Sequence, residues 1–387
     1  MNSRERVLIA LNHEEPDRVP IDLGGSVVTS ISKLTYAALR EHLGFPRIPI
    51  HEMETVQQIA FVDDDMLDRL GVDVIPVFPN PPSDYRAVFI QEPGESMSFK
   101  DEFGATLRKP KDCFYYDWRE FPLSEPSIDA MWKMPWPDPA DPARYHGLRE
   151  RVKRLRANTD RALFSIAPCG HDLFNQLFRV RGMENGLMDL LLNEEFAVAF
   201  LDRLMETIIT AQTLFLSEVG DLVDVHFAAD DLSGQSGPLI APDLYRRLIK
   251  PRETRILRAI RAKTKAKIFS HSCGAIMEFI PDLIEMGVDI LNPVQVAADG
   301  MDTALLKKRF GKRLSFWGGG CDTQRVLARG TPDEVRAEVR QRIRDLAPGG
   351  GFVFNPVHNI QPLVPPANII AMFDEVLSFG VNRRQQS

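Results

Sequence analysis

The stretch AKIFSHSCGAIMEFIPDLIEMGVDILNPVQ, residues 266–295, has the pattern of a strand, a helix and a second strand. The run over 266–274 is short and largely apolar, whereas 275–287 has the apolar spacing of an amphipathic helix. Residues 288–295 return to a short apolar run. A strand, a helix of this length and another strand form a βαβ unit, so the two strands are expected to be parallel.

The same alternation extends along most of the chain. Eight short β-type runs, most of them followed by a helix-like stretch, span residues 18–25, 72–78, 162–170, 222–230, 266–274, 288–295, 313–321 and 351–359. Eight such units with a final helix predict an α/β fold, the (β/α)8 TIM barrel. An open doubly wound sheet is the alternative, but no G-x-G-x-x-G opens the first unit and no P-loop motif occurs.

One interval between strands is much longer than the others. About 85 residues separate the second and third runs, and they are rich in proline and aromatic residues with short β-like stretches. We therefore predict a single barrel domain over 1–387 with an insertion at about 80–160. The insertion either caps the barrel mouth or is an excursion without a role at the site. The tail over 382–387 is expected to fray.

Composition and charge exclude several function classes. The chain has 387 residues, 44% of them hydrophobic, and a formal net charge of −7. That length can bury a large core, and the acidic balance argues against partners such as nucleic acid or an anionic membrane. No apolar run approaches the roughly 18 residues of a membrane span, and the first residues lack the features of a signal peptide. These features predict a cytoplasmic protein.

The strand ends carry a metal-ligating pattern. His271 and Cys273 stand two residues apart in an extended segment, so their side chains point the same way. Cys321 lies 48 residues after Cys273, at the end of the seventh run, and can reach the same point across the barrel mouth. One imidazole and two thiolates suit Zn²⁺, and three protein ligands leave an open position, as in catalytic sites. The alternative is that the cysteines are small buried hydrophobes.

Further polar residues fall at strand ends and are candidates for substrate contact: Asp22, Cys169, Gln235, Asn292, His358 and Asn359. Asp230 is a candidate catalytic residue beside His271, Cys273 and Cys321, with helix capping as an equal alternative. For His358 a structural role is as good an expectation as a substrate contact. Cys169 either forms a half-site with His171 or lines the pocket.

Three segments carry a resemblance to a known superfamily: SRERVLIALNHEEPDRVPIDLGG (3–25), HSCGAIMEFIPDLIEMGVDILNPVQ (271–295) and HNIQPLVPPANIIAMFDEV (358–376). They resemble the uroporphyrinogen decarboxylase superfamily, over almost the whole chain. That superfamily contains the decarboxylases of haem synthesis and zinc-dependent, corrinoid-linked methyltransferases. Both groups imply a (β/α)8 barrel, in agreement with the strand pattern.

The residues favour the methyltransferase branch. The decarboxylases have an arginine-rich segment, roughly R-Q-A-G-R, after the first strand and an aspartate at the end of the second. This chain has DLGGS at 22–26 and VFPN at 77–80 instead. The methyltransferases have H-x-C and a later Cys in a glycine-rich turn, which His271, Cys273 and Cys321 match. The ending NPVHNIQPLVPPAN (355–368) looks more like members that demethylate methoxylated compounds.

The resemblance implies a zinc-dependent enzyme that moves a methyl group between a small substrate and the cobalt of a corrinoid protein. The substrate is expected to be a methoxylated, for example aromatic, compound, and the partner protein supplies the cobamide. The alternatives are methylcobamide-dependent methylation of a thiol or other acceptor, a metal-free decarboxylase, and a non-enzymatic carrier. No D-x-H-x-x-G motif is present, so the chain is not expected to hold a corrinoid itself. A homodimer is a candidate assembly.

Overall fold

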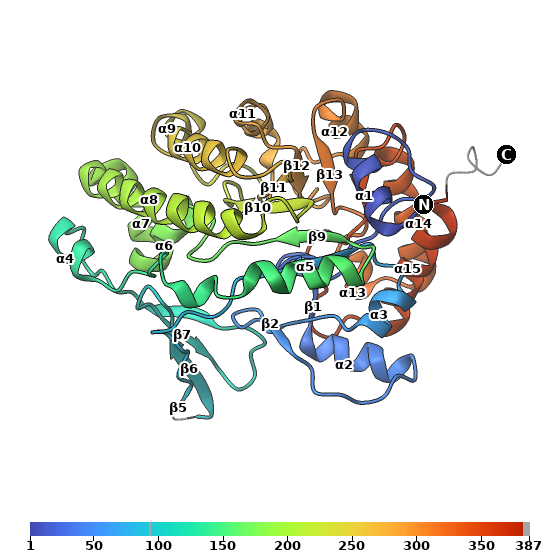
Figure 1. The fold of residues 1–387 in the computed structure, drawn as a ribbon, viewed down its shortest axis with the longest axis horizontal. Helices are drawn as coiled ribbons and strands as arrows, with labels where there is room; N and C mark the ends of the chain where they lie inside the picture. Colours follow the sequence, from blue (N-terminus) through green and yellow to red (C-terminus); the bar gives the residue numbers. More distant parts are fainter. Residues whose placement is uncertain (93, 382–387) are drawn as a thin grey trace.

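The central sheet of the computed structural model, which describes residues 1–92 and 94–381, contains seven parallel strands in the described part. Their order is β14-β13-β12-β11-β10-β9-β4. The strands are β4 (Val74–Val77), β9 (Ala162–Ser165), β10 (Val225–Ala229), β11 (Lys267–His271), β12 (Ile290–Asn292), β13 (Ser315–Trp317) and β14 (Phe352–Val353). Figure 1 shows them inside a ring of helices. Consecutive strands along the chain are neighbours in the sheet, as a right-handed series of βα units requires.

The first predicted strand closes the barrel between β4 and β14. Ile21 forms a parallel bridge with Phe354, and the backbone N–H of Asp22 donates to the carbonyl of Phe354 at 2.8 Å. On the other side, the N–H of Asp73 donates to the carbonyl of Ile21 at 2.8 Å. Each predicted β-type run therefore contributes to the barrel, and the predicted (β/α)8 architecture is confirmed.

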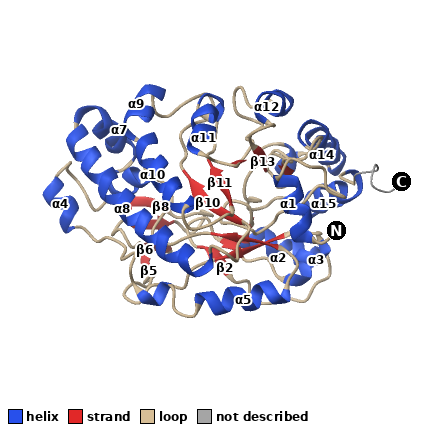
Figure 2. Cartoon of the chain, turned by 45° about the horizontal axis from the view of Figure 1, so that its top comes forward, coloured by secondary structure: helices blue, strands red, loops and turns tan. Residues whose placement is uncertain are grey.

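The barrel helices surround the strands and bury one face each, as Figure 2 shows for helices in blue around strands in red. They are α1 (Ser3–Leu11), α2 (Lys33–His42), α3 (Asp64–Arg69), α5 (Leu148–Asn158), α6 (Phe174–Arg181), α7 (Met183–Leu192), α8 (Glu194–Val219), α9 (Pro242–Leu248), α10 (Lys250–Arg261), α11 (Ile280–Met286), α12 (Thr303–Phe310), α13 (Val326–Arg329), α14 (Pro332–Leu346) and α15 (Pro366–Phe379), with 3-10 turns η1 (Pro142–Arg144) and η2 (Ile276–Glu278). Within the described residues, none of these helices combines the length and apolar character needed to cross a bilayer.

Aromatic side chains fill the barrel interior beneath its mouth. Phe164, Phe269 and Trp317 meet edge to face, with ring centroids 4.8 to 5.6 Å apart, and Phe227 stacks on Phe269 at 5.5 Å. Such pairs contribute roughly 0.5–1.5 kcal/mol each beyond their burial. Because side chains alternate along a strand, the residue two positions after Phe269 also points inward. That residue is His271, which therefore lies on top of the aromatic layer.

The long interval between β4 and β9 forms a separate antiparallel sheet. Its strands are β5 (Ile90–Glu92), β6 (Ser96–Lys100), β7 (Thr106–Lys109) and β8 (Asp117–Glu120), followed by α4 (Ile128–Lys133). Figure 1 shows β5–β7 projecting from the barrel at the lower left. A small sheet of β1 (Ile31–Ser32), β2 (Glu52–Glu54) and β3 (Ile59–Ala60) lies near its inner end, where the N–H of Tyr116 donates to the carbonyl of Val56 at 2.9 Å. The tail over 382–387, predicted to fray, lies outside the described residues.

Candidate metal centre at the barrel mouth

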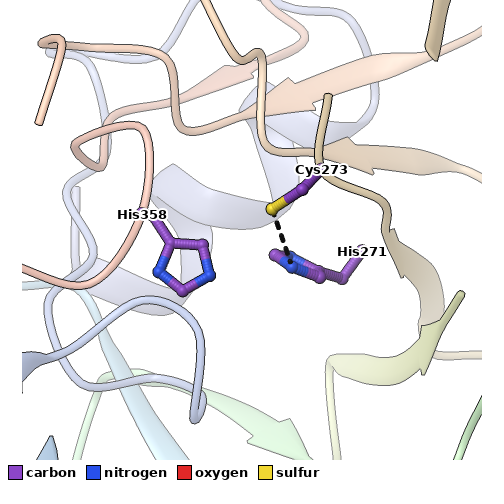
Figure 3. A group of neighbouring side chains, drawn as sticks. All are labelled: His271, Cys273 and His358. Carbon is purple, nitrogen blue, oxygen red and sulfur yellow. Dashed lines mark hydrogen bonds between the residues drawn. The ribbon is translucent and has the colours of Figure 1, made fainter. Parts of the chain in front are cut away.

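Three side chains with metal-ligating atoms meet at the barrel mouth. His271 is the last residue of β11, Cys273 follows two residues later, and His358 lies in the loop after β14. Their ligating atoms all lie within 4.8 Å of one another, and Cys273 Sγ is 3.4 Å from His271 Nε2. Figure 3 shows the thiol and the two imidazoles grouped around one point. Two imidazoles and a thiol form a donor set that suits Zn²⁺.

The neighbouring strand fixes the orientation of His271. His271 pairs in register with Asn292 at the end of β12, so their side chains are adjacent. His271 Nδ1 lies 2.6 Å from Asn292 Oδ1, and Asn292 Nδ2 donates to the carbonyl of Trp317 at 2.8 Å. Because the Asn292 nitrogen is the donor, its oxygen accepts the Nδ1 proton of His271. The lone pair of His271 is therefore on Nε2, the atom that faces the thiol, as metal-binding histidines require.

Asp231, in the loop after β10, places a carboxylate beside the cluster. Its Oδ1 accepts the backbone N–H of Cys273 at 2.7 Å and lies 3.8 Å from His271 Nε2. The Asp231 side chain is 41% exposed, whereas that of His271 is 7% exposed. The carboxylate adds negative charge and an oxygen donor next to the three other donors, which favours a bound cation.

Burial sets the protonation states of the cluster. Desolvation, and then the charge of Asp231, raise the pKa of the Cys273 thiol well above its ordinary value. Desolvation, and then the neighbouring His271, lower the pKa of His358 to about 3, so that its imidazole is neutral at neutral pH. Cys273 and His358 therefore present uncharged donors, and metal binding would displace the thiol proton.

A cavity of about 690 Å³ adjoins the cluster and is lined by both Cys273 and His358. Tyr115 and Trp118, from the insertion, line the same cavity. Its volume lies within the roughly 300–1,000 Å³ typical of small-molecule sites. The insertion thus contributes to the wall of the candidate site, and the Tyr115 hydroxyl donates to Gln361 Oε1 in the loop after β14.

Comparison with known sequences places the chain in a family. Residues 119–379, more than half of the chain, match the model of the family described as uroporphyrinogen decarboxylase (URO-D). The chain belongs to the uroporphyrinogen decarboxylase family. The resemblance expected from the three sequence segments is thereby confirmed at the level of the family.

The individual relatives of this uroporphyrinogen decarboxylase family member share little sequence identity with it. A uroporphyrinogen decarboxylase from Alkalilimnicola ehrlichii is 24% identical over 65% of this chain and 67% of that protein. One from Thioalkalivibrio sulfidiphilus is 27% identical over 38% of this chain, and the match spans 40% of its own length. A solved methyltransferase from Methanosarcina mazei has a TM-score of 0.64 and 18% identity, covering 98% of this chain and 99% of that one. The last comparison shows a shared fold.

The position of Cys321 in this family member corrects the ligand set predicted from the sequence. β13 ends at Trp317, and Gly318 and Gly319, with φ of +88° and +79°, then turn the chain away from the strand direction. Cys321 lies four residues beyond the strand end, fully buried, with Sγ 3.3 Å from Glu338 Oε2 on α14. Among the described residues, His358 rather than Cys321 joins His271 and Cys273.

Asp230, predicted as catalytic, anchors a helix instead. Its carboxylate accepts the backbone N–H groups of Leu173, Phe174 and Asn175 at 2.8, 2.5 and 3.1 Å, at the start of α6. The carboxylate thus satisfies amides that the first helical turn leaves without partners. The carboxylate of this loop that faces the cluster is the next residue, Asp231.

Two of the predicted substrate contacts form structural hydrogen bonds. Asn292 is fully buried and holds His271, as described above. Asn359 is also fully buried; its Oδ1 accepts the N–H of Ser30 at 2.7 Å, and its Nδ2 donates to the carbonyl of Val27 at 2.8 Å. Asn359 therefore joins the last strand loop to the first, and neither amide is free to bind a substrate.

Cys169 and Gln235 have different outcomes. Cys169 is buried at a turn with φ of +66°, and desolvation raises the pKa of its thiol to about 12. It is not among the described residues that line the cavity, so the structure does not support a substrate contact there. Gln235 lines the cavity beside Cys273, and its role as a substrate contact stays a prediction.

Sequence reasoning missed the residues that the insertion brings to the cavity. Tyr115, Tyr116 and Trp118 line it, together with Gln57 from the turn between β2 and β3. Their signal in the sequence is the aromatic run FYYDW at 114–118. An aromatic run of this kind is equally typical of a packed core, and Tyr116 indeed packs against Phe99 at 5.1 Å.

A first test concerns the residue that orients His271. We expect Asn292→Ala to weaken zinc binding by about 10- to 100-fold, because outer hydrogen-bond partners of metal ligands have effects of this size. Competition with a chromophoric chelator would measure the affinity. Asn355→Ala is the matched control, since Asn355 is also a fully buried amide but donates to the carbonyl of Asp22 at 3.0 Å. Equal weakening in both variants would contradict the orienting role.

Asp22 is another predicted substrate contact, and it is fully buried beneath the barrel mouth. We expect the burial of its carboxyl group to make the stability of the protein depend on pH. Its Oδ2 accepts Trp317 Nε1–H at 2.9 Å, and desolvation raises the pKa of the carboxyl to about 7. The folded state thus binds a proton that the unfolded state releases, and stability falls as pH rises from the unfolded pKa toward about 7. Between about pH 4.5 and 7.5, the unfolding free energy of the wild type should fall by about 3 kcal/mol relative to Asp22→Asn.

Denaturant unfolding of both proteins at the two pH values would measure this difference. A constant difference between wild type and Asp22→Asn would show that the carboxyl ionises normally in the folded chain.

Proposed function

We propose that the chain is a zinc-dependent methyltransferase that moves a methyl group between a small methoxylated compound and the cobalt of a corrinoid protein. The observation that carries the proposal is the group of His271, Cys273 and His358, of which Cys273 and His358 line a small-molecule cavity. Membership of the uroporphyrinogen decarboxylase family agrees with it, and so does the fold shared with a methyltransferase from Methanosarcina mazei.

The protein's own contribution is to hold three donors in position. Asn292 fixes the His271 ring, so its free lone pair points toward Cys273. Burial keeps His358 neutral, and Asp231 accepts the Cys273 N–H, which anchors the thiol-bearing loop. A bound zinc ion would supply Lewis acidity to a substrate oxygen or lower the pKa of a substrate thiol. The cavity, which Cys273 and His358 help to line, would position the methyl group of the substrate and limit its contact with water.

The test combines metal analysis with a transfer assay. Protein purified in zinc-replete buffer is expected to hold about one zinc per chain. The zinc-loaded protein, mixed anaerobically with reduced cobalamin and a methoxylated phenol, is expected to release the demethylated phenol, as measured by chromatography. The methyl group passes to the cobalt, which supplies the electron pair of the new bond, and the phenolic oxygen takes up a proton from water. A chain without zinc after this purification would contradict the proposal.

Two other reactions are distinguished by the same assay. Methylation of a thiol by methylcobamide would consume the methylated cobalamin when a thiol is added, and it would also depend on zinc. A metal-free decarboxylase would release carbon dioxide from its acid substrate equally well after treatment with a chelator. Zinc-dependent release of the phenol is expected only for the proposed reaction.

A further inference from the structure

The wall of the cavity over the cluster consists of amides, hydroxyls and aromatic rings. The glutamines Gln57, Gln235, Gln295, Gln324 and Gln361 line it. Among the described residues that line the cavity, none is a lysine or arginine, and Asp117 is the acidic one. Arg325 follows Gln324 in the chain, but its guanidinium is paired with Asp322 at 3.0 Å. The wall therefore offers polar contacts without a positive side chain.

Hydrogen bonds to neighbouring residues orient two of these side-chain amides so that their NH₂ groups are available as donors. Gln295 Oε1 accepts the backbone N–H of Gly274 at 2.7 Å, directly behind Cys273. Gln57 Oε1 accepts Asn359 Nδ2–H at 3.2 Å. Because the carbonyl oxygen of each amide is already engaged, the NH₂ group is the end left to serve a ligand. These two side chains are thus suited to a hydrogen-bond acceptor.

Ser233 adds a hydroxyl to the same wall. The residue is 5% exposed, it lines the cavity, and its buried Oγ has no hydrogen-bond partner among the described residues. A buried hydroxyl without a partner costs free energy that a bound ligand can recover. The Ser233 backbone packs closely against Gly274, the residue after Cys273. A Cβ on Gly274, which has a φ of +88°, would lie only 2.4 Å from the carbonyl oxygen of Ser233.

The charges around the cluster disfavour an anionic ligand. Asp231 lies 3.8 Å from His271 Nε2, and Cys273 would bind a divalent ion as a thiolate. Together the carboxylate and the thiolate offset the two positive charges of such an ion, so the loaded site has no surplus positive charge. A carboxylate or phosphate on the substrate would have no cation to pair with in the wall and would lie near Asp231.

We infer that the substrate portion in this cavity carries no negative charge and is bound through neutral acceptors such as ether, hydroxyl or amide oxygens. This inference rests on the proposed function for the location of the site and narrows its substrate class to uncharged methoxylated compounds. It separates the chain from enzymes that take polycarboxylate substrates, which need basic groups to pair with each carboxylate.

The test is a pair of ligands that differ in charge but hardly in shape. Vanillamide and vanillate share the methoxyphenol ring and carry a neutral amide or a carboxylate at the same position. Titration calorimetry on the zinc-loaded chain is expected to show vanillamide binding at least about tenfold more tightly than vanillate, since unpaired like charges are costly in a site. Equal binding, tighter binding of vanillate, or saturable binding of neither ligand would overturn the inference.

Two variants and a control localise the preference. Gln235→Arg adds a positive charge to the wall at an exposed position and is expected to move the preference toward vanillate by about tenfold. Gln91→Arg makes the same charge change on exposed β5, away from the cavity, and should leave the ratio unchanged. Ser233→Ala is expected to weaken vanillamide binding by about three- to tenfold. Thermal melting of each variant would verify that the fold is intact.

The outcomes separate this inference from the proposed function. Binding is measured without methyl transfer, and zinc content is determined independently. A zinc-loaded, transfer-competent chain that binds vanillate as well as vanillamide would leave the function standing and remove the substrate class. A chain that prefers vanillamide but holds no zinc would support the substrate class and contradict the proposed function.

Discussion

Replacing His358 with alanine is expected to remove zinc from the purified protein, with a loss of affinity of more than about 100-fold. His358 supplies one of the three donors that lie within 4.8 Å of one another, and without it only His271 and Cys273 remain. Loss of a direct ligand should exceed the roughly 10- to 100-fold effect of removing an outer partner. Zinc per chain, measured by elemental analysis, and affinity, measured by chelator competition, would both report the loss.

The matched comparison is Cys321→Ala, which removes the ligand expected from the sequence. Because Cys321 Sγ contacts Glu338 and is fully buried, this variant should retain zinc with unchanged affinity. Its main effect should be a modest loss of stability from the emptied space beside α14. If Cys321→Ala loses zinc while His358→Ala retains it, the ligand set would be the one expected from the sequence.

Replacing Asp73 with alanine is expected to lower the free energy of unfolding by about 3–5 kcal/mol, because it takes the carboxylate partner from Arg18 and leaves Arg6 with Asp17 alone. Asp73 is fully buried between α1 and the first strand segment. Its carboxylate accepts Arg6 Nη1–H at 2.7 Å, Arg18 Nη1–H at 2.6 Å and the backbone N–H of Ile21 at 2.8 Å. The substitution therefore weakens the attachment of the segment that closes the barrel. Denaturant unfolding followed by circular dichroism would measure the change.

Glu41→Ala provides the control for a lost ion pair that is not buried. The Arg47–Glu41 pair is 86% and 66% exposed, so its loss should cost less than about 1 kcal/mol. A comparable loss in both variants would mean that burial does not strengthen the Asp73 network.

The barrel was predictable because its information is local. Each βα unit carries its own apolar run and amphipathic stretch, and the repetition of that unit defines the barrel. Strand lengths were overestimated: the run over 313–321 forms only Ser315–Trp317, and 18–25 forms two isolated bridges, at Arg18 and Ile21. Strand β13 ends where Gly318 and Gly319 adopt positive φ. Glycine permits this conformation, but its presence in a sequence does not show whether the conformation is adopted.

The site was only partly predictable for the same reason. His271 and Cys273 are linked by strand alternation, which can be recognised in the sequence, and the structure places their donor atoms together. The third donor depends on how a loop turns after its strand, and the glycine-rich turn directs Cys321 toward α14. Likewise, Asp230 and Asp231 are adjacent in sequence, and only the position of α6 decides which one is engaged by the helix.

The closure of the barrel through its two ends has a consequence for biosynthesis. Residues 20–22 have their sheet partner at Phe354, so these hydrogen bonds cannot form until Phe354 has left the ribosome. His358 follows Phe354 by four residues and emerges directly after it. A nascent chain that displays His271 and Cys273 therefore has an incomplete donor set. The proposed metal site and the barrel ring are thus completed at the same stage of synthesis.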